Sequence, residues 1–226
     1  NTNVAILSGD AMILLSYKQL SLLENKTLSP VLDVFNKTTI QVCEGQQYDL
    51  DYENDFQVRI EDYVEMIRLK TSVLLAASAK IGAIIGGASE DEQNLFYSFG
   101  ENLGLAFQLQ DDYLDAFGDT TTFGKKIGGD ILAGKKTFLL LKALELSKGD
   151  YHEQLIGLIN SKSFSPEEKI AKVIEIYRKL KIDTITNDFI NRYFAKASEC
   201  LAKLEEKGIK TLSLVEYSQK LSGRKN

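Results

Sequence analysis

Residues 89–117 read SEDEQNLFYSFGENLGLAFQLQDDYLDAF, and this stretch indicates the fold more clearly than any other part of the chain. Ser89, followed three residues later by Glu92, is the pattern of a helical capping box. Large apolar side chains then recur at the three- and four-residue intervals of one helical face: Phe96, Phe99, Leu103 and Phe107. The stretch therefore predicts a long amphipathic helix over 90–117 whose apolar face packs on a core.

The rest of the chain has the same helical character. Its two prolines occur as Ser29-Pro30 and Ser165-Pro166, which place a capping hydroxyl before a residue suited to the first helical position. We therefore expect both prolines to open helices. The predicted helices are 3–22, 30–49, 57–86, 90–117, 136–147, 151–160, 166–180, 184–207 and 212–222. No convincing strand pattern, linker or repeat interrupts them, so the sequence predicts one all-α domain over residues 1–226.

Composition excludes several classes of protein. The chain has 226 residues, 44% of them hydrophobic, which is enough for a large core, and its net charge of −5 argues against a general nucleic-acid binder. His152, Cys43 and Cys200 are too few for a His/Cys zinc site, and two cysteines favour a reducing cytoplasm over a disulfide framework. No apolar run has the length of a membrane span, so we expect no membrane insertion.

The second half of the 57–86 helix is unusually rich in small residues. Residues 73–88 read VLLAASAKIGAIIGGA, in which alanine, glycine and serine dominate. Small side chains either let helix backbones approach closely or leave open volume beside them. Tight packing and the wall of an apolar ligand tunnel are therefore both compatible with this segment.

The stretch FQLQDDYLD, residues 107–115, carries the strongest chemical signal. On a helix, Asp111 and Asp115 share a face one turn apart, with Gln108 a turn before them. Two like charges at that spacing repel, so a site-facing arrangement needs a cation. Carboxylate oxygens are hard ligands, and Mg²⁺ prefers one or two of them together with substrate phosphates. The sequence alone also allows a solvated acidic helix face.

A lysine-rich and glycine-rich segment follows the acidic turn. Residues 123–137 read FGKKIGGDILAGKKT, with Lys125 and Lys135 among its four lysines. Lysines bind phosphate as point charges, and glycines let the backbone approach it closely. The two segments together predict a diphosphate pocket, with a basic flexible loop as the alternative. A nucleotide-binding P-loop is disfavoured because Lys136 stands where a hydroxyl should hold Mg²⁺, and because no strand precedes the segment.

The order of these motifs resembles that of the trans-isoprenyl diphosphate synthases, the all-α polyprenyl synthetases that make farnesyl and geranylgeranyl diphosphate. The resemblance rests on Tyr63 and Lys70-Thr71, on the F-Q-x-x-D-D-x-x-D turn and on the segment 124–137, with Gly9-Asp10-Ala11 and Gly45-Gln46 in the expected order. It implies a large helical bundle of the isoprenoid synthase type around a central apolar cavity.

The resemblance also implies roles for individual residues. Asp111, Asp112 and Asp115 match the family's second aspartate-rich motif, whose carboxylates hold Mg²⁺ against an allylic diphosphate. The family's diphosphate-binding lysines correspond here to Lys70, Lys125 and Lys135. Its polar residues near the carbocation correspond to Thr71 and Gln108. Its supporting polar positions correspond to Gln46, Asp49 and Asp130.

The implied reaction is head-to-tail transfer of an allylic group to isopentenyl diphosphate, with release of pyrophosphate. A homodimer is also implied, while the length of the product is not. The family's first aspartate-rich motif would precede Gly9, where this sequence has none, so we expect the domain to be incomplete at its N-terminus. Two other functions remain open: a non-catalytic subunit of a heteromeric prenyl synthase, and a terpene cyclase.

Overall fold

The computed structural model describes residues 1–53, 55, 57–118, 127–161 and 163–223, and within these ranges it contains helices and connecting segments but no strand. The N-terminal half comprises α1 (Thr2–Leu20), α2 (Asn25–Asp51), α3 (Ile60–Ile67), η1 (Arg68–Ser72), α4 (Val73–Ile85) and α5 (Glu90–Phe117). The C-terminal half comprises α7 (Gly129–Ala133), α8 (Phe138–Leu146), α9 (Asp150–Asn160), α10 (Pro166–Lys179), α11 (Ile182–Glu206) and α12 (Leu212–Ser222).

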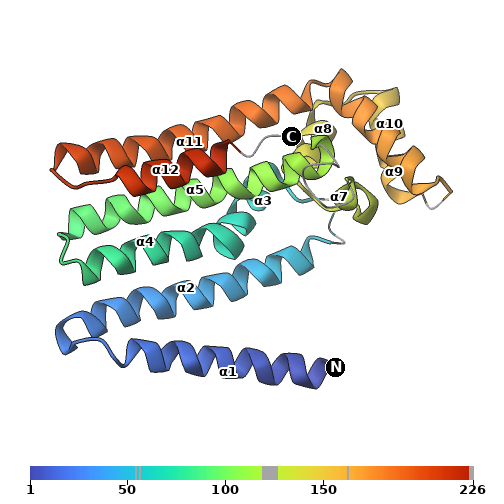
Figure 1. Cartoon of the computed structure of the whole chain (residues 1–226). Helices are drawn as coiled ribbons and strands as arrows, with labels where there is room; N and C mark the ends of the chain where they lie inside the picture. The colour runs from blue at the N-terminus through green and yellow to red at the C-terminus, as the bar shows by residue number, and fades with distance from the viewer. Residues whose placement is uncertain (54, 56, 119–126, 162, 224–226) are drawn as a thin grey trace.

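Helix α5 is the centre of the bundle. It packs between α4 on one side and α11 on the other, α2 lies beyond α4, and α1 is outermost (Figure 1). The shorter helices α7 to α10 gather at the end of the bundle where α5 finishes. Apolar side chains of α3, α5, α8 and α11 form one continuous core cluster, which includes Tyr63, Leu109 and Phe138. The end of α5, which carries the residues predicted to be functional, lies where the long helices meet the short ones.

The all-α fold expected from the sequence is confirmed, and so is the role of one proline. Pro166 is the first residue of α10. Just before it, the Ser165 hydroxyl accepts a hydrogen bond from the Glu168 amide, and the Glu168 carboxylate accepts one from the Ser165 amide. The expectation for Pro30 is wrong, because α2 begins five residues earlier at Asn25. A proline this close to a helix start removes a single backbone hydrogen bond, so the preceding turn can still form.

The helix expected over 57–86 is present as an uninterrupted helical run over 60–85, but it is not α-helical throughout. It is divided into α3 and α4 by a π-helical turn, η1, which carries Lys70 and Thr71. A π turn holds more residues than an α turn and is frequent at functional sites. It changes which side chains face the neighbouring helices on either side of it. Gly45 of α2 lies directly against this turn, so that a Cβ atom there would be 2.3 Å from the Lys70 backbone nitrogen.

The small residues of α4 have two different environments. Ala76 is completely buried, and a Cβ atom on Gly100 of α5 would lie 2.7 Å from its Cα atom, so this part of α4 is tightly packed. Gly82 and Gly86 instead line a surface cavity of about 600 Å³ together with Phe96 of α5 and Leu214 of α12. Tight packing therefore explains the first half of the segment, and the second half borders open volume.

Replacing Gly45 by alanine is expected to lower the free energy of unfolding by about 1–3 kcal/mol, since the added methyl group overlaps backbone atoms of η1. The matched control is Gly82→Ala, where a Cβ atom meets nothing within 4 Å and the helix propensity of alanine should stabilise α4 by up to about 1 kcal/mol. Urea denaturation measures both. Equal effects at the two glycines would contradict the close approach of α2 to η1.

Candidate active site

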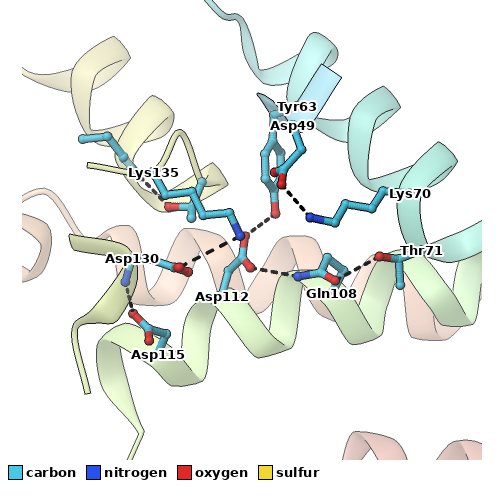
Figure 2. Close-up of polar contacts among 11 residues, drawn as sticks. Asp49, Tyr63, Lys70, Thr71, Gln108, Asp112, Asp115, Asp130 and Lys135 are labelled. Atoms are coloured by element: carbon cyan, nitrogen blue, oxygen red, sulfur yellow. Dashed lines mark hydrogen bonds and ion pairs between the residues drawn. The ribbon is translucent and has the colours of Figure 1, made fainter. Parts of the chain in front are cut away.

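Side chains from three other segments meet those of the C-terminal half of α5 (Figure 2). The end of α2 contributes Asp49, the α3–η1 region contributes Tyr63, Lys70 and Thr71, and the α7–α8 region contributes Asp130 and Lys135. Beside them lies a cavity of about 340 Å³, lined by Asp49 and Lys135 among others. Residues that are far apart in the sequence thus surround one polar site.

Asp112 is the buried centre of this site. Only 3% of the residue is exposed, and its side chain is directed into the bundle. The Tyr63 hydroxyl donates a hydrogen bond of 2.5 Å to Asp112 Oδ2, and Gln108 Nε2 donates one of 3.1 Å to Oδ1. Gln108 in turn accepts a hydrogen bond of 3.1 Å from the Thr71 hydroxyl. A chain of hydrogen bonds therefore joins α3, α5 and η1.

Burial raises the pKa of Asp112 to about 7, because the charged carboxylate loses its hydration. The nearby Lys135 ammonium and the hydrogen bond from Tyr63 act in the opposite direction, and the charge of Asp130 adds to the increase. The pKa of Asp112 therefore depends on two opposing effects: burial, which raises it, and the positive charge of Lys135, which lowers it.

Asp115 organises the segment that follows α5. Its side-chain Oδ2 atom accepts a hydrogen bond of 2.9 Å from the Asp130 backbone amide, and its backbone carbonyl oxygen accepts one of 2.7 Å from the Gly128 amide. Gly128 has a φ angle of +86°, and a Cβ atom there would lie 2.5 Å from Ile170 Cδ1. Glycine is required at this position by both the backbone conformation and the space. Asp115 thereby holds the start of α7 against α5.

The two described lysines of the site face carboxylates. Lys70 Nζ lies 2.6 Å from Asp49 Oδ2, and Lys135 Nζ lies 3.9 Å from Asp130 Oδ1. Burial lowers the pKa of Lys135, but the surrounding carboxylates, Asp112 first, outweigh it and leave that pKa raised. Burial is the main cause of the raised pKa of Asp130, where Asp115, Asp111 and Asp49 add to the effect. These aspartates therefore act on one another as a single cluster of charge.

Lys136 has a different role from its neighbour. Its residue is only 8% exposed, and its ammonium donates hydrogen bonds to the carbonyl oxygens of Glu53, at 2.9 Å, and Gly134, at 3.3 Å. It thereby connects the segment after α2 to the turn that carries Lys135. In the described part of the chain, the helices α5 and α7 precede this turn.

Most of the residues predicted from the sequence come together here. Hydrogen bonds or ion pairs in this site involve Asp49, Lys70, Thr71, Gln108, Asp112, Asp115, Asp130 and Lys135. Asp111 is half-buried on the same turn of α5 and acts on Asp130 and Lys135 through its charge. Gln46 is exposed on α2, and Lys125 lies outside the described residues.

The aspartates do not all share one face. Among the described residues, no three carboxylate, histidine or cysteine side chains converge closely enough to enclose a metal ion. The reason is visible in Figure 2, where Asp112 is directed toward Tyr63 whereas Asp115 is directed toward the start of α7. The metal-binding role of the three aspartates stays a prediction. Tyr63 contributes to the family resemblance, but the sequence indicates no role for it because the partner of its hydroxyl is set by the folded structure.

Solved structures share this architecture. A crystal structure of a geranylgeranyl pyrophosphate synthase superposes with a TM-score of 0.89 at 39% identity, covering 99% of this chain and 69% of that one. A geranylgeranyl pyrophosphate synthetase from Pyrococcus horikoshii gives a TM-score of 0.81 at 32% identity, covering 88% and 61%. The fold is therefore the all-α isoprenoid synthase fold.

Sequence comparison identifies the family within that fold. The family model described as polyprenyl synthetase matches residues 1–177, and the chain belongs to this family. A short chain isoprenyl diphosphate synthase of Methanocaldococcus jannaschii is 38% identical over 176 residues, which is 77% of this chain and 53% of that protein. A geranylgeranyl diphosphate synthase of Sulfolobus acidocaldarius is 34% identical over 208 residues, or 90% and 62%. The chain thus spans 53% of the length of the first relative and 62% of the length of the second.

Proposed function

We propose that the complete protein is a prenyltransferase that condenses an allylic diphosphate with isopentenyl diphosphate head-to-tail. The observation that carries this proposal is the turn of α5 with Asp111, Asp112 and Asp115, where the charges of Asp111 and Asp112 act on Lys135, a residue that lines the cavity of about 340 Å³. The names of the relatives, which are isoprenyl and geranylgeranyl diphosphate synthases, support the same activity.

The chemistry of the donors fits Mg²⁺. Asp49, Asp111, Asp112, Asp115 and Asp130 act on one another or on Lys135 through their charges, and all five offer the hard oxygen atoms that Mg²⁺ prefers. We propose that Asp111, Asp112 and Asp115 hold the ion, with Asp130 and Asp49 in support. When bound, Mg²⁺ would neutralise part of the charge of the substrate's diphosphate.

The lysines complete the proposed diphosphate site. Lys70 and Lys135 would leave their ion pairs with Asp49 and Asp130 to contact the phosphate oxygens as point charges, and Lys125 is proposed to join them. These charges stabilise the leaving diphosphate, so that the carbon–oxygen bond of the allylic substrate breaks. Thr71 and Gln108 lie at the reacting carbon in this proposal. The double bond of isopentenyl diphosphate then attacks, and a proton leaves to the released pyrophosphate.

The proposed activity is tested by incubating the complete protein with Mg²⁺, an allylic diphosphate and labelled isopentenyl diphosphate. The expected result is a labelled, longer prenyl diphosphate and an equal amount of pyrophosphate, both abolished by a chelator. Pyrophosphate release without incorporation of the label would indicate a cyclase. Activity only after addition of a second, different subunit would indicate a non-catalytic role, and either result would overturn the proposal.

We also propose that the protein is a homodimer in which α1 contributes to the contact. This helix has no buried residue, and several of its apolar side chains are exposed, among them Leu7, Leu14 and Met12. Exposed apolar surface of this extent is typical of a protein interface. Light scattering of the complete protein should give twice the monomer mass, and a monomer would contradict the proposal. No described helix is long and apolar enough to span a membrane, while the cytoplasmic location stays a prediction.

A further inference from the structure

The hydrogen bonds around Asp112 have a definite direction. The Tyr63 hydroxyl donates to one oxygen of Asp112, and the side-chain amide of Gln108 donates to the other. An ionised carboxylate can only accept hydrogen bonds, and here Tyr63 donates to Asp112 Oδ2 while Gln108 Nε2 donates to Asp112 Oδ1. The nitrogen of the Gln108 amide therefore faces Asp112, and its oxygen faces away.

This direction reaches the next residue. The Gln108 oxygen lies 3.1 Å from Thr71 Oγ1, and an amide oxygen can only accept. Thr71 must therefore donate its single hydroxyl hydrogen to Gln108. The lone pairs of the Thr71 oxygen can then act only as acceptors. The chain of bonds thus converts the Thr71 hydroxyl into an acceptor of fixed orientation.

Tyr63 is the fixed end of this chain. Its residue has no exposed surface and belongs to the core cluster formed with Met66, Leu109 and Phe138. A hydroxyl group at such a depth is costly to bury without a partner. The Tyr63 hydroxyl donates its hydrogen to Asp112, and its oxygen is in turn held by the Phe138 backbone. The apolar packing of the ring therefore fixes where the carboxylate must lie.

We propose that Tyr63 is a positioning residue for prenyl transfer: through Asp112 and Gln108 it presents the Thr71 oxygen to the reacting carbon as a hydrogen-bond acceptor. This inference rests on the proposed prenyl transfer. An acceptor at that place stabilises the positive charge that develops when the allylic diphosphate ionises, and it does not contact the diphosphate. Loss of the Tyr63 hydroxyl should therefore affect the chemical step more than the binding of either substrate.

The test is Tyr63→Phe in the complete protein, which removes one oxygen and keeps the ring. We expect kcat to fall about tenfold, the size of one lost hydrogen bond that acts in the transition state, with the KM of both diphosphates nearly unchanged. The control is Tyr193→Phe, the same change on a residue of α11 that packs on the same core cluster. It should leave kcat unchanged. A purely structural role of Tyr63 would lower the melting temperature without lowering kcat.

A double-mutant cycle with Thr71→Val separates the two roles further. Tyr63 and Thr71 share no hydrogen bond and are joined through Gln108 and Asp112. In the Thr71→Val background, Tyr63→Phe should therefore lower kcat no further. Additive effects, or unchanged kcat in Tyr63→Phe, would overturn the proposal.

A second variant tests the chain from its other side if Tyr63→Phe does not fold. Gln108→Glu replaces the amide nitrogen that faces Asp112 by an oxygen, and kcat should fall at least about tenfold at nearly unchanged KM. Unchanged kcat in Gln108→Glu would overturn the inference. An inactive wild-type protein would instead refute the proposed function, so the two failures are distinguishable.

Discussion

Asp111→Ala in the complete protein is expected to lower the turnover of prenyl transfer by about 10²–10³-fold while the helical circular dichroism stays that of the unchanged protein. The Asp111 side chain is half-buried on a turn of α5, and its charge interacts with those of Asp130 and Lys135. Removing it takes away a proposed Mg²⁺ ligand without opening the core. Steady-state kinetics at saturating substrate measure the loss.

The control for this variant is Asp188→Ala, which removes an exposed carboxylate from α11. Its turnover should equal that of the wild type. If Asp111→Ala also retained near-wild-type turnover over a range of Mg²⁺ concentrations, the assignment of the acidic turn to metal binding would be lost.

Lys135→Ala is expected to raise the KM of the allylic diphosphate about tenfold and to lower kcat by about 10²-fold, because the ammonium contributes to both binding and ionisation. The residue is surrounded by the charges of Asp112, Asp130, Asp49 and Asp111, which its removal leaves less balanced. Lys210→Ala, at an exposed position between α11 and α12, is the matched control. Kinetic constants equal to those of the wild type would show that Lys135 does not contact the substrate.

The helical fold could be predicted from local signals because those signals act locally in the structure. Ser165, Pro166 and Glu168 form the expected cap, and the 90–117 helix is α5. Neither the π turn nor its close contact with Gly45 of another helix could be predicted from the sequence. A glycine that permits a close contact has the same sequence signal as one that faces open space, as Gly82 does.

The candidate site, too, was predictable from the sequence only in part. The spacing of the acidic turn and the lysines after it indicated a phosphate and metal site, because charge of both signs in one short stretch has few structural explanations. The direction of each side chain was not predictable. Asp112 is turned inward because Tyr63, 49 residues earlier, offers its hydroxyl there, and Asp115 is occupied by a backbone amide of α7. Such partners are known only once the chain is folded.

The most direct test of the central claim is a crystal structure of the complete protein with Mn²⁺ in place of Mg²⁺ and a bisphosphonate in place of the substrate diphosphate. Anomalous scattering is expected to locate the metal against the carboxylates of the acidic turn on α5, with phosphonate oxygens within hydrogen-bond distance of Lys70 and Lys135. Metal and bisphosphonate bound elsewhere, with Asp111 facing bulk solvent, would contradict it.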